Sequence, residues 1–225
     1  MSAASSEDAD RTTALLLSFV AGFVDTFSFV ALFGLFTAHV TGNFVLIGAA
    51  VAGHGHAGVV GKLLALPVFV LAVAATRWLQ RRWTESPGAF VLVQCAGLLA
   101  FMGCGLAAGP VVDADAAAAI IAGQLGVAAM AVQNVLSRSV FVHLGPTTVM
   151  TGNVTQVTMD LVDRLVAPDA SASDAARIGR MWPPLVAFAA GAVGAGLLAG
   201  RLGFLALALP IALLLAIWWR TRAPS

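Results

Sequence analysis

The chain has 225 residues, of which 60% are hydrophobic and only 10% are charged, and its formal net charge is +1. A soluble domain carries about 25% charged residues, so this composition indicates a protein whose main solvent is the lipid bilayer. The near-zero charge excludes nucleic-acid binding, because that function needs a strongly basic surface.

The first segment, residues 1–11, is acidic and rich in small side chains. It lacks the basic region that begins a signal peptide, and the apolar run that follows is too long for one. We therefore predict a disordered N-terminal tail over residues 1–11, ahead of the first membrane span.

Six apolar runs reach or approach the length of about 20 residues that a membrane-spanning helix needs. Two further segments, 35–53 and 144–166, each contain one Thr-Gly-Asn sequence. These segments either span the membrane or form half-helices that enter and leave on the same side. The six runs are 12–33, 62–79, 88–109, 116–142, 182–200 and 203–219.

The distribution of basic residues favours re-entry. If both Thr-Gly-Asn segments re-enter and the N-terminus is cytoplasmic, ten of the twelve Lys and Arg residues fall on the cytoplasmic side, as the positive-inside rule requires. If both segments span instead, the split is seven against five. We therefore predict an all-α, multi-pass membrane protein with about six spans, two half-helices and a cytoplasmic N-terminus.

Four residues of the first half recur in the second half at an offset of 110 positions. They are Thr37, Thr41, Gly42 and Asn43, matched by Thr147, Thr151, Gly152 and Asn153. Each half then contains a span, a polar loop with a half-helix, and two more spans, which gives repeats over 12–110 and 111–222 within one membrane domain. Three spans per repeat make the second copy inverted, an arrangement typical of transporters.

Each Thr-Gly-Asn sequence is expected to turn the chain at membrane depth. Lipid offers no hydrogen bonds, so Thr and Asn side chains would satisfy the loop backbone, and Gly would permit the turn. Asn43 and Asn153 are expected to cap the half-helices, because Asn is among the best N-cap residues. Two helix N-termini near the midplane would suit a polar or anionic solute. The alternative is a tight helix corner that binds nothing.

Asp25 is the only carboxylate within a predicted span. Ionisable residues at this depth usually line a pathway or pair with a partner. One interpretation is that Asp25 takes up and releases a proton coupled to solute movement, and His39 could join that relay. The other is a buried ion pair between Asp25 and Arg138. The corresponding span of the second half also carries Gln133 and Asn134.

Two stretches resemble the signatures of one family. The first is AGFVDTFSFVALFGLFTAHVTGNFVLIGAAVAG, and the second, over 131–161, contains AVQN and TTVMTGNVTQ. Together they resemble the YoaK-like family of bacterial membrane proteins. The resemblance implies a bacterial inner-membrane protein of a family of unknown function, sometimes described as permeases of small metabolites. It supports as characteristic positions Asp25, Thr41, Gly42, Asn43, Gln133, Asn134, Arg138, Thr151, Gly152 and Asn153.

The sequence thus predicts a transporter or channel for a small polar or anionic metabolite. No catalytic or metal-ligand motif is present, so we expect no enzyme activity, cofactor or metal. A homodimer is one expectation, because 225 residues make a thin wall around a pathway. The alternative function is a scaffold, a regulatory subunit or an intramembrane enzyme. The predicted site comprises Asp25, His39, Thr41, Gly42, Asn43, Gln133, Asn134, Arg138, Thr151, Gly152 and Asn153.

Overall fold

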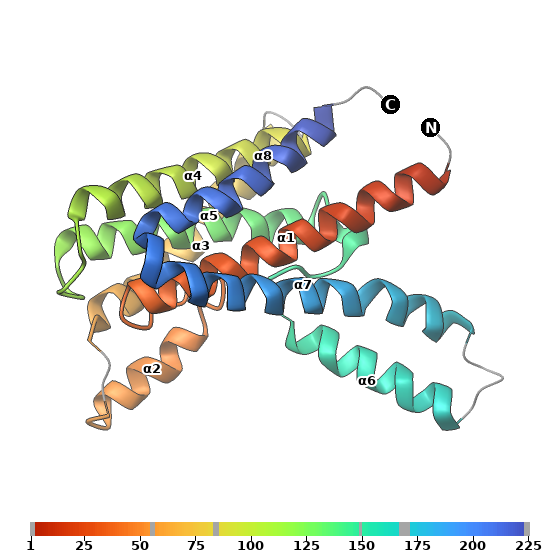
Figure 1. The fold of residues 1–225 in the computed structure, drawn as a ribbon, viewed down its shortest axis with the longest axis horizontal. Coiled ribbons are helices and arrows are strands. Elements are labelled where there is room, and N and C mark those ends of the chain that lie inside the picture. Colours follow the sequence, from red (N-terminus) through yellow and green to blue (C-terminus); the bar gives the residue numbers. More distant parts are fainter. Residues whose placement is uncertain (1–2, 55–56, 83–85, 149, 167–171, 223–225) are drawn as a thin grey trace.

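The computed structural model describes residues 3–54, 57–82, 86–148, 150–166 and 172–222, and every element in these ranges is helical (Figure 1). The all-α prediction is therefore confirmed. The helices are α1 (Ala3–Ala31), α2 (Gly42–Val51), α3 (Val59–Arg82), α4 (Pro87–Ala108), α5 (Ala117–Arg138), α6 (Thr151–Val166), α7 (Ala172–Leu202) and α8 (Ala208–Arg222), with 3-10 turns η1 (Val142–Leu144) and η3 (Gly203–Leu207).

In the part of the chain that the structure describes, five helical segments are long and apolar enough to cross a membrane. Four of them lie in α1, α3, α4 and α5, and the fifth, Arg177–Arg222, has 46 residues and contains α7, η3 and α8. The structure therefore supports the class of helical membrane proteins, whereas the count of six spans stays a prediction.

The long helices form an elongated bundle, and each half of the chain packs against the other (Figure 1). Helix α1 packs along α7, α3 packs along α5, and α4 packs along both α5 and α8. The first helix of each half therefore lies against the third helix of the opposite half. The short helices are more peripheral, because α2 packs against α3 and α6 packs against α7.

Helices α2 and α6 begin near the middle of the bundle and run to opposite ends of it (Figure 1). Helix α2 has 10 residues, which makes it about 15 Å long, or roughly half of the hydrocarbon core. After α1 the loop runs back to the middle of the bundle, and α2 then runs to the same end of the bundle at which α1 ends. After α5 the second loop also runs back to the middle, and α6 then runs to the end at which α5 ends (Figure 1).

Residues 3–11 form the start of α1, where the sequence predicts a disordered tail. Extending an existing helix costs little, because each added residue gains a backbone hydrogen bond. The hydroxyl groups of Thr12 and Thr13 donate back to backbone carbonyls in this segment. The Asp10 carboxylate also lies 3.4 Å from Nε2 of His143, which ties the extension to the loop after α5.

An ion pair between a buried carboxylate and a partly exposed arginine holds α6 to α7. The Asp160 side chain is fully buried and accepts a hydrogen bond from Nε of Arg177 at 2.6 Å. Nε2 of Gln156 donates to the same carboxylate at 2.7 Å. The Arg177 guanidinium holds the pKa of Asp160 below its ordinary value, against the opposing effect of burial.

Glycines allow α1 and α7 to cross at close range. A Cβ atom added at Gly22 would lie 2.1 Å from the carbonyl oxygen of Phe188, and one added at Gly191 would lie 2.1 Å from that of Phe19. The crossing therefore requires small residues on both helices. It also places the Phe188 ring beside the His39 ring, at 6.3 Å between centroids. The crossing therefore helps to position the loop between α1 and α2, which contains His39.

Gly191→Ala is expected to destabilise the protein, because the added methyl group meets backbone that must move. Overpacking of this kind costs about 1–3 kcal/mol, which should lower the melting temperature in detergent. Gly196→Ala on the same helix is the matched control, since a Cβ there meets nothing within 4 Å. An equal melting temperature for both variants would contradict the close crossing.

Candidate functional site

Asp25 binds the backbone of the first loop, residues 32–41, from its buried position in α1. Its Oδ1 accepts hydrogen bonds from the N–H groups of Thr37 at 2.8 Å and Ala38 at 2.7 Å, and a longer one from His39 at 3.4 Å. Its Oδ2 lies 3.0 Å from Nδ1 of His39. Successive N–H groups around one oxygen form an anion-binding nest, and here the anion is the protein's own carboxylate.

The predicted ion pair between Asp25 and Arg138 is wrong. Among the described residues, the Asp25 carboxylate makes its hydrogen bonds to the first loop. Arg138 ends α5, and its side chain is exposed. The nest explains why no arginine is needed, because hydrogen bonds from backbone N–H groups to a carboxylate are charge-assisted and strong.

The expectation that Asn43 and Asn153 cap the half-helices is also wrong. Helix α2 begins at Gly42 and α6 begins at Thr151, so each Asn lies inside the first turn. Asn43 instead exchanges two hydrogen bonds, both of 2.9 Å, with the backbone of Phe36. Asn153 donates to the carbonyl of Pro146 at 3.2 Å, and proline has no N–H to return a second bond. Each Asn thus closes its loop.

The second loop, residues 139–150, is held by neutral amides. Asn134 in α5 stands where Asp25 stands in α1, and its Oδ1 accepts a hydrogen bond from the Thr148 hydroxyl at 2.8 Å. Nε2 of Gln133 donates to the Thr147 hydroxyl at 3.2 Å. A buried carboxylate therefore organises the first loop, and buried amides organise the second.

Two further polar residues support the loops: Ser28, which lies on the same face of the first span as Asp25, and Gln94, which the sequence did not single out. Ser28 lies 3.1 Å from the Thr37 hydroxyl and donates to the Asp25 carbonyl at 2.9 Å. Gln94 donates to Oε1 of Gln133 at 2.8 Å. The available signal was a single amide within an apolar helix, since α4 contains no other Asn or Gln, and such residues at membrane depth usually have a partner.

The predicted residues differ in burial. Five are buried, two are half-buried and four are exposed: Asp25, Asn43, Gln133, Asn134 and Asn153; His39 and Gly42; and Thr41, Arg138, Thr151 and Gly152, in that order. Of the exposed residues, Thr41, Thr151 and Gly152 lie at the starts of α2 and α6, near the middle of the bundle (Figure 1). Within the described ranges, no hydrogen bond joins the first loop to the second, so the structure has two neighbouring polar centres and not a single cluster.

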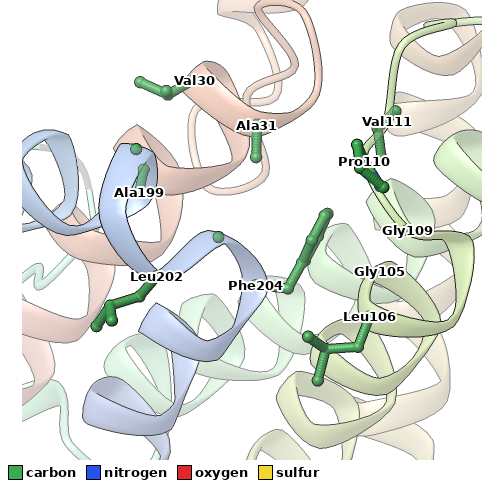
Figure 2. Close-up of a pocket in the computed structure, with 12 residues that line it drawn as sticks. Val30, Ala31, Gly105, Leu106, Gly109, Pro110, Val111, Ala199, Leu202 and Phe204 are labelled. Atoms are coloured by element: carbon green, nitrogen blue, oxygen red, sulfur yellow. The ribbon is translucent and has the colours of Figure 1, made fainter.

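Two cavities differ in their chemistry. The larger, of about 480 Å³, lies among the ends of α1, α4 and α7 with η3 (Figure 2). Glycine, proline and apolar side chains such as Phe204 line it, so it offers no polar side chain to orient a solute. The smaller has about 270 Å³ and is lined by Ser137, Arg138, Val142, Gly145, Pro146 and Thr148. Binding sites need a few converging polar groups, so the smaller cavity is the candidate site.

A family model described as "Protein of unknown function (DUF1275)" matches residues 13–219. The match covers both polar loops and both signature stretches, and it confirms the family resemblance found in the sequence. No curated protein and no solved structure matches the chain.

Asp25→Ala is expected to loosen the first loop, because the N–H groups of residues 37–39 lose their acceptor. Losing one hydrogen bond to a charged group costs about 1.5–3 kcal/mol, so amide hydrogen exchange over residues 36–40 should rise about tenfold or more in nanodiscs. Asp163→Ala removes an exposed carboxylate from α6 and should leave this exchange unchanged. Unaltered exchange in Asp25→Ala would contradict the nest.

Proposed function

We propose a function from the site itself, because the chain belongs to the DUF1275 family, a family of proteins of unknown function. The proposed function is transport of a small polar solute along a water-filled path past the two loops. The observation that carries it is the exposure of Thr41, Thr151 and Gly152 near the middle of the bundle.

Lipid cannot surround these residues without cost. Hydrocarbon offers no hydrogen bonds, so irregular backbone at membrane depth must face protein or water. The first N–H groups of α2 already donate to the loop before it, as from Gly42 to the His39 carbonyl at 2.8 Å. The polar groups left to satisfy are the hydroxyls of the exposed residues Thr41 and Thr151, and water at this depth would satisfy them. Half-helices that run to opposite ends are the arrangement around many transport sites.

Six spans and two re-entrant half-helices form the membrane topology of this proposal. The segment Arg177–Arg222 has 46 residues, and as one helix it would be about 70 Å long, more than twice the hydrocarbon thickness of about 30 Å. A break at η3 supports two crossings. Both termini lie at one end of the bundle (Figure 1), where α3 ends on Arg81 and Arg82, which supports a cytoplasmic N-terminus in the bacterial inner membrane.

An inverted repeat is the second part of this topology. Asn43 bonds to Phe36 as Asn153 bonds to Pro146, in each case across seven residues. The Ser28 hydroxyl donates to the carbonyl three residues earlier, as Ser137 does in α5. In addition, α1 packs on α7 and α5 packs on α3. The first helix of each half thus contacts the third helix of the other half, as expected for two related halves.

Asp25 and His39 form the proposed proton-coupling pair. The His39 side chain is 33% exposed and that of Asp25 is 5% exposed, so His39 can exchange a proton with water and pass it to the carboxylate. A proton on Asp25 would remove the charge that strengthens its hydrogen bonds to the first loop. Protonation would therefore loosen that loop, which links the coupling ion to the path.

Thiol labelling tests for the water-filled path. In a chain without Cys95 and Cys104, Thr41→Cys and Thr151→Cys should react with a membrane-impermeant thiol reagent, because the reactive thiolate forms in water. Leu71→Cys is the control, since Leu71 is 69% exposed in the middle of α3 and would face lipid. If Thr41→Cys and Thr151→Cys stay unlabelled like the control, there is no water-filled path. The protein is then better explained as a scaffold whose loops are covered by a second polypeptide, such as a second copy.

Asp25→Asn tests proton coupling. Proteoliposomes given a bacterial metabolite extract and a pH gradient should concentrate a solute that mass spectrometry detects, and empty liposomes should not. Asp25→Asn should abolish accumulation while exchange of that solute continues, and His39→Gln should slow accumulation. Asp163→Asn is the matched control on an exposed carboxylate. Accumulation at the parental level in Asp25→Asn would remove Asp25 from the coupling mechanism.

A further inference from the structure

The two loops differ in the group that meets their backbone. In the first loop, Oδ1 of Asp25 accepts the N–H groups of Thr37 and Ala38. At the offset of 110 residues, the matching positions of the second loop are Thr147 and Thr148. The helix beside them presents Asn134 in place of a carboxylate, and its oxygen accepts the Thr148 hydroxyl.

The backbone N–H groups of Thr147 and Thr148 have no acceptor within the described part of the chain. Thr147 is fully buried and Thr148 is 2% exposed. Buried N–H groups without a partner are rare, and each one indicates a water molecule or an ion that completes the site. Since the matching groups of the first loop bind a carboxylate oxygen, an anion is the acceptor that suits this backbone.

Arg138 supplies a positive charge at the same place. Its side chain lines the cavity of about 270 Å³ together with Ser137 and Thr148, and it forms no ion pair with any described residue. Asp10, whose carboxylate reaches the second loop, is paired with His143 at 3.4 Å. The second loop therefore has a base and no acid of its own, whereas the first has an internal acid.

We propose that this cavity binds a small carboxylate from solution. The guanidinium of Arg138 would bind the carboxylate oxygens, and the N–H group of Thr148, which lines the cavity, would donate to this carboxylate as the N–H group of Ala38 donates to Asp25 in the first loop. The binding site itself does not depend on the proposed function. Only the identification of this carboxylate as the transported solute rests on the proposed function.

The dimensions of the cavity set the size of the ligand. Sites for drug-sized ligands have about 300–1,000 Å³, so a cavity of about 270 Å³ suits a molecule of a few carbon atoms. The planar guanidinium fork matches the two oxygens of a carboxylate. Val142 and Pro146 line the same cavity and offer an apolar wall to a short alkyl chain. A monocarboxylate such as propionate therefore fits better than a neutral amide of the same shape.

Binding of propionate to the full-length protein in nanodiscs tests the proposal. Broadening of the ¹³C signal of labelled propionate should report binding, and propionamide should neither bind nor compete. Arg138→Gln should weaken propionate binding about tenfold or more. Arg164→Gln, which removes an exposed arginine from α6, is the control for charge and should bind as the parent does.

Asn134→Asp is the second variant, because it gives the second loop the internal carboxylate that the first loop has. It should abolish propionate binding while the melting temperature shows that the protein is folded. Equal binding of propionamide, or propionate binding that survives both Arg138→Gln and Asn134→Asp, would overturn the proposal.

Measuring flux separates this proposal from the proposed function. Propionate binding without any solute flux in proteoliposomes would remove transport and leave the anion site. Solute flux with no propionate binding would remove the anion site and leave transport.

Discussion

The hydrogen bonds between the Asp25 carboxylate and the N–H groups of Thr37 and Ala38 are the interaction on which the other features depend. A loop that leaves its helix inside a bundle must satisfy its own backbone, and a buried carboxylate needs donors around it. The loop therefore supplies the donors that the carboxylate requires, and the carboxylate supplies the acceptor that the loop backbone requires. The turn that they stabilise lets α2 begin near the middle of the bundle (Figure 1), and it places His39 between the carboxylate and the exterior.

The second loop shows how the same backbone design gains a different capability. Asn134 and Gln133 hold its threonine hydroxyls, which fixes the loop without using its N–H groups. A cavity with Arg138 then lies beside that backbone. In the proposed mechanism the two loops have different roles. The first loop surrounds the Asp25 carboxylate, whose charge a proton can remove, and the second binds a carboxylate from solution.

Sequence reasoning reached the features that depend on local pattern. Helix class follows from long apolar runs, and the paired loops follow from the recurrence of Thr-Gly-Asn, so both could be read along the chain. The link between Asp25 and His39 was also suggested by the sequence. The backbone partners of Asp25 could not be predicted, because every residue has an N–H group and the sequence does not show which of them face the carboxylate. Arg138 was chosen as a partner because it lies one turn from Asn134 in the matching span. Asn43 was misread as a cap because its real partner, the Phe36 backbone, is defined only by the path of the loop. Gln94 needed the packing of α4 on α5 to reveal its role.

The central claim is that the chain re-enters the membrane at both Thr-Gly-Asn loops. The most direct measurement is the sidedness of single cysteines in intact cells, at Gly58 and Asp113 and at positions 84 and 168, in a chain without Cys95 and Cys104. Re-entry predicts that Gly58→Cys and Asp113→Cys react from outside, and that the other two react only after permeabilisation. If Gly58→Cys and Asp113→Cys lie instead on the side of the N-terminus, the loops lead into full spans and the account is wrong.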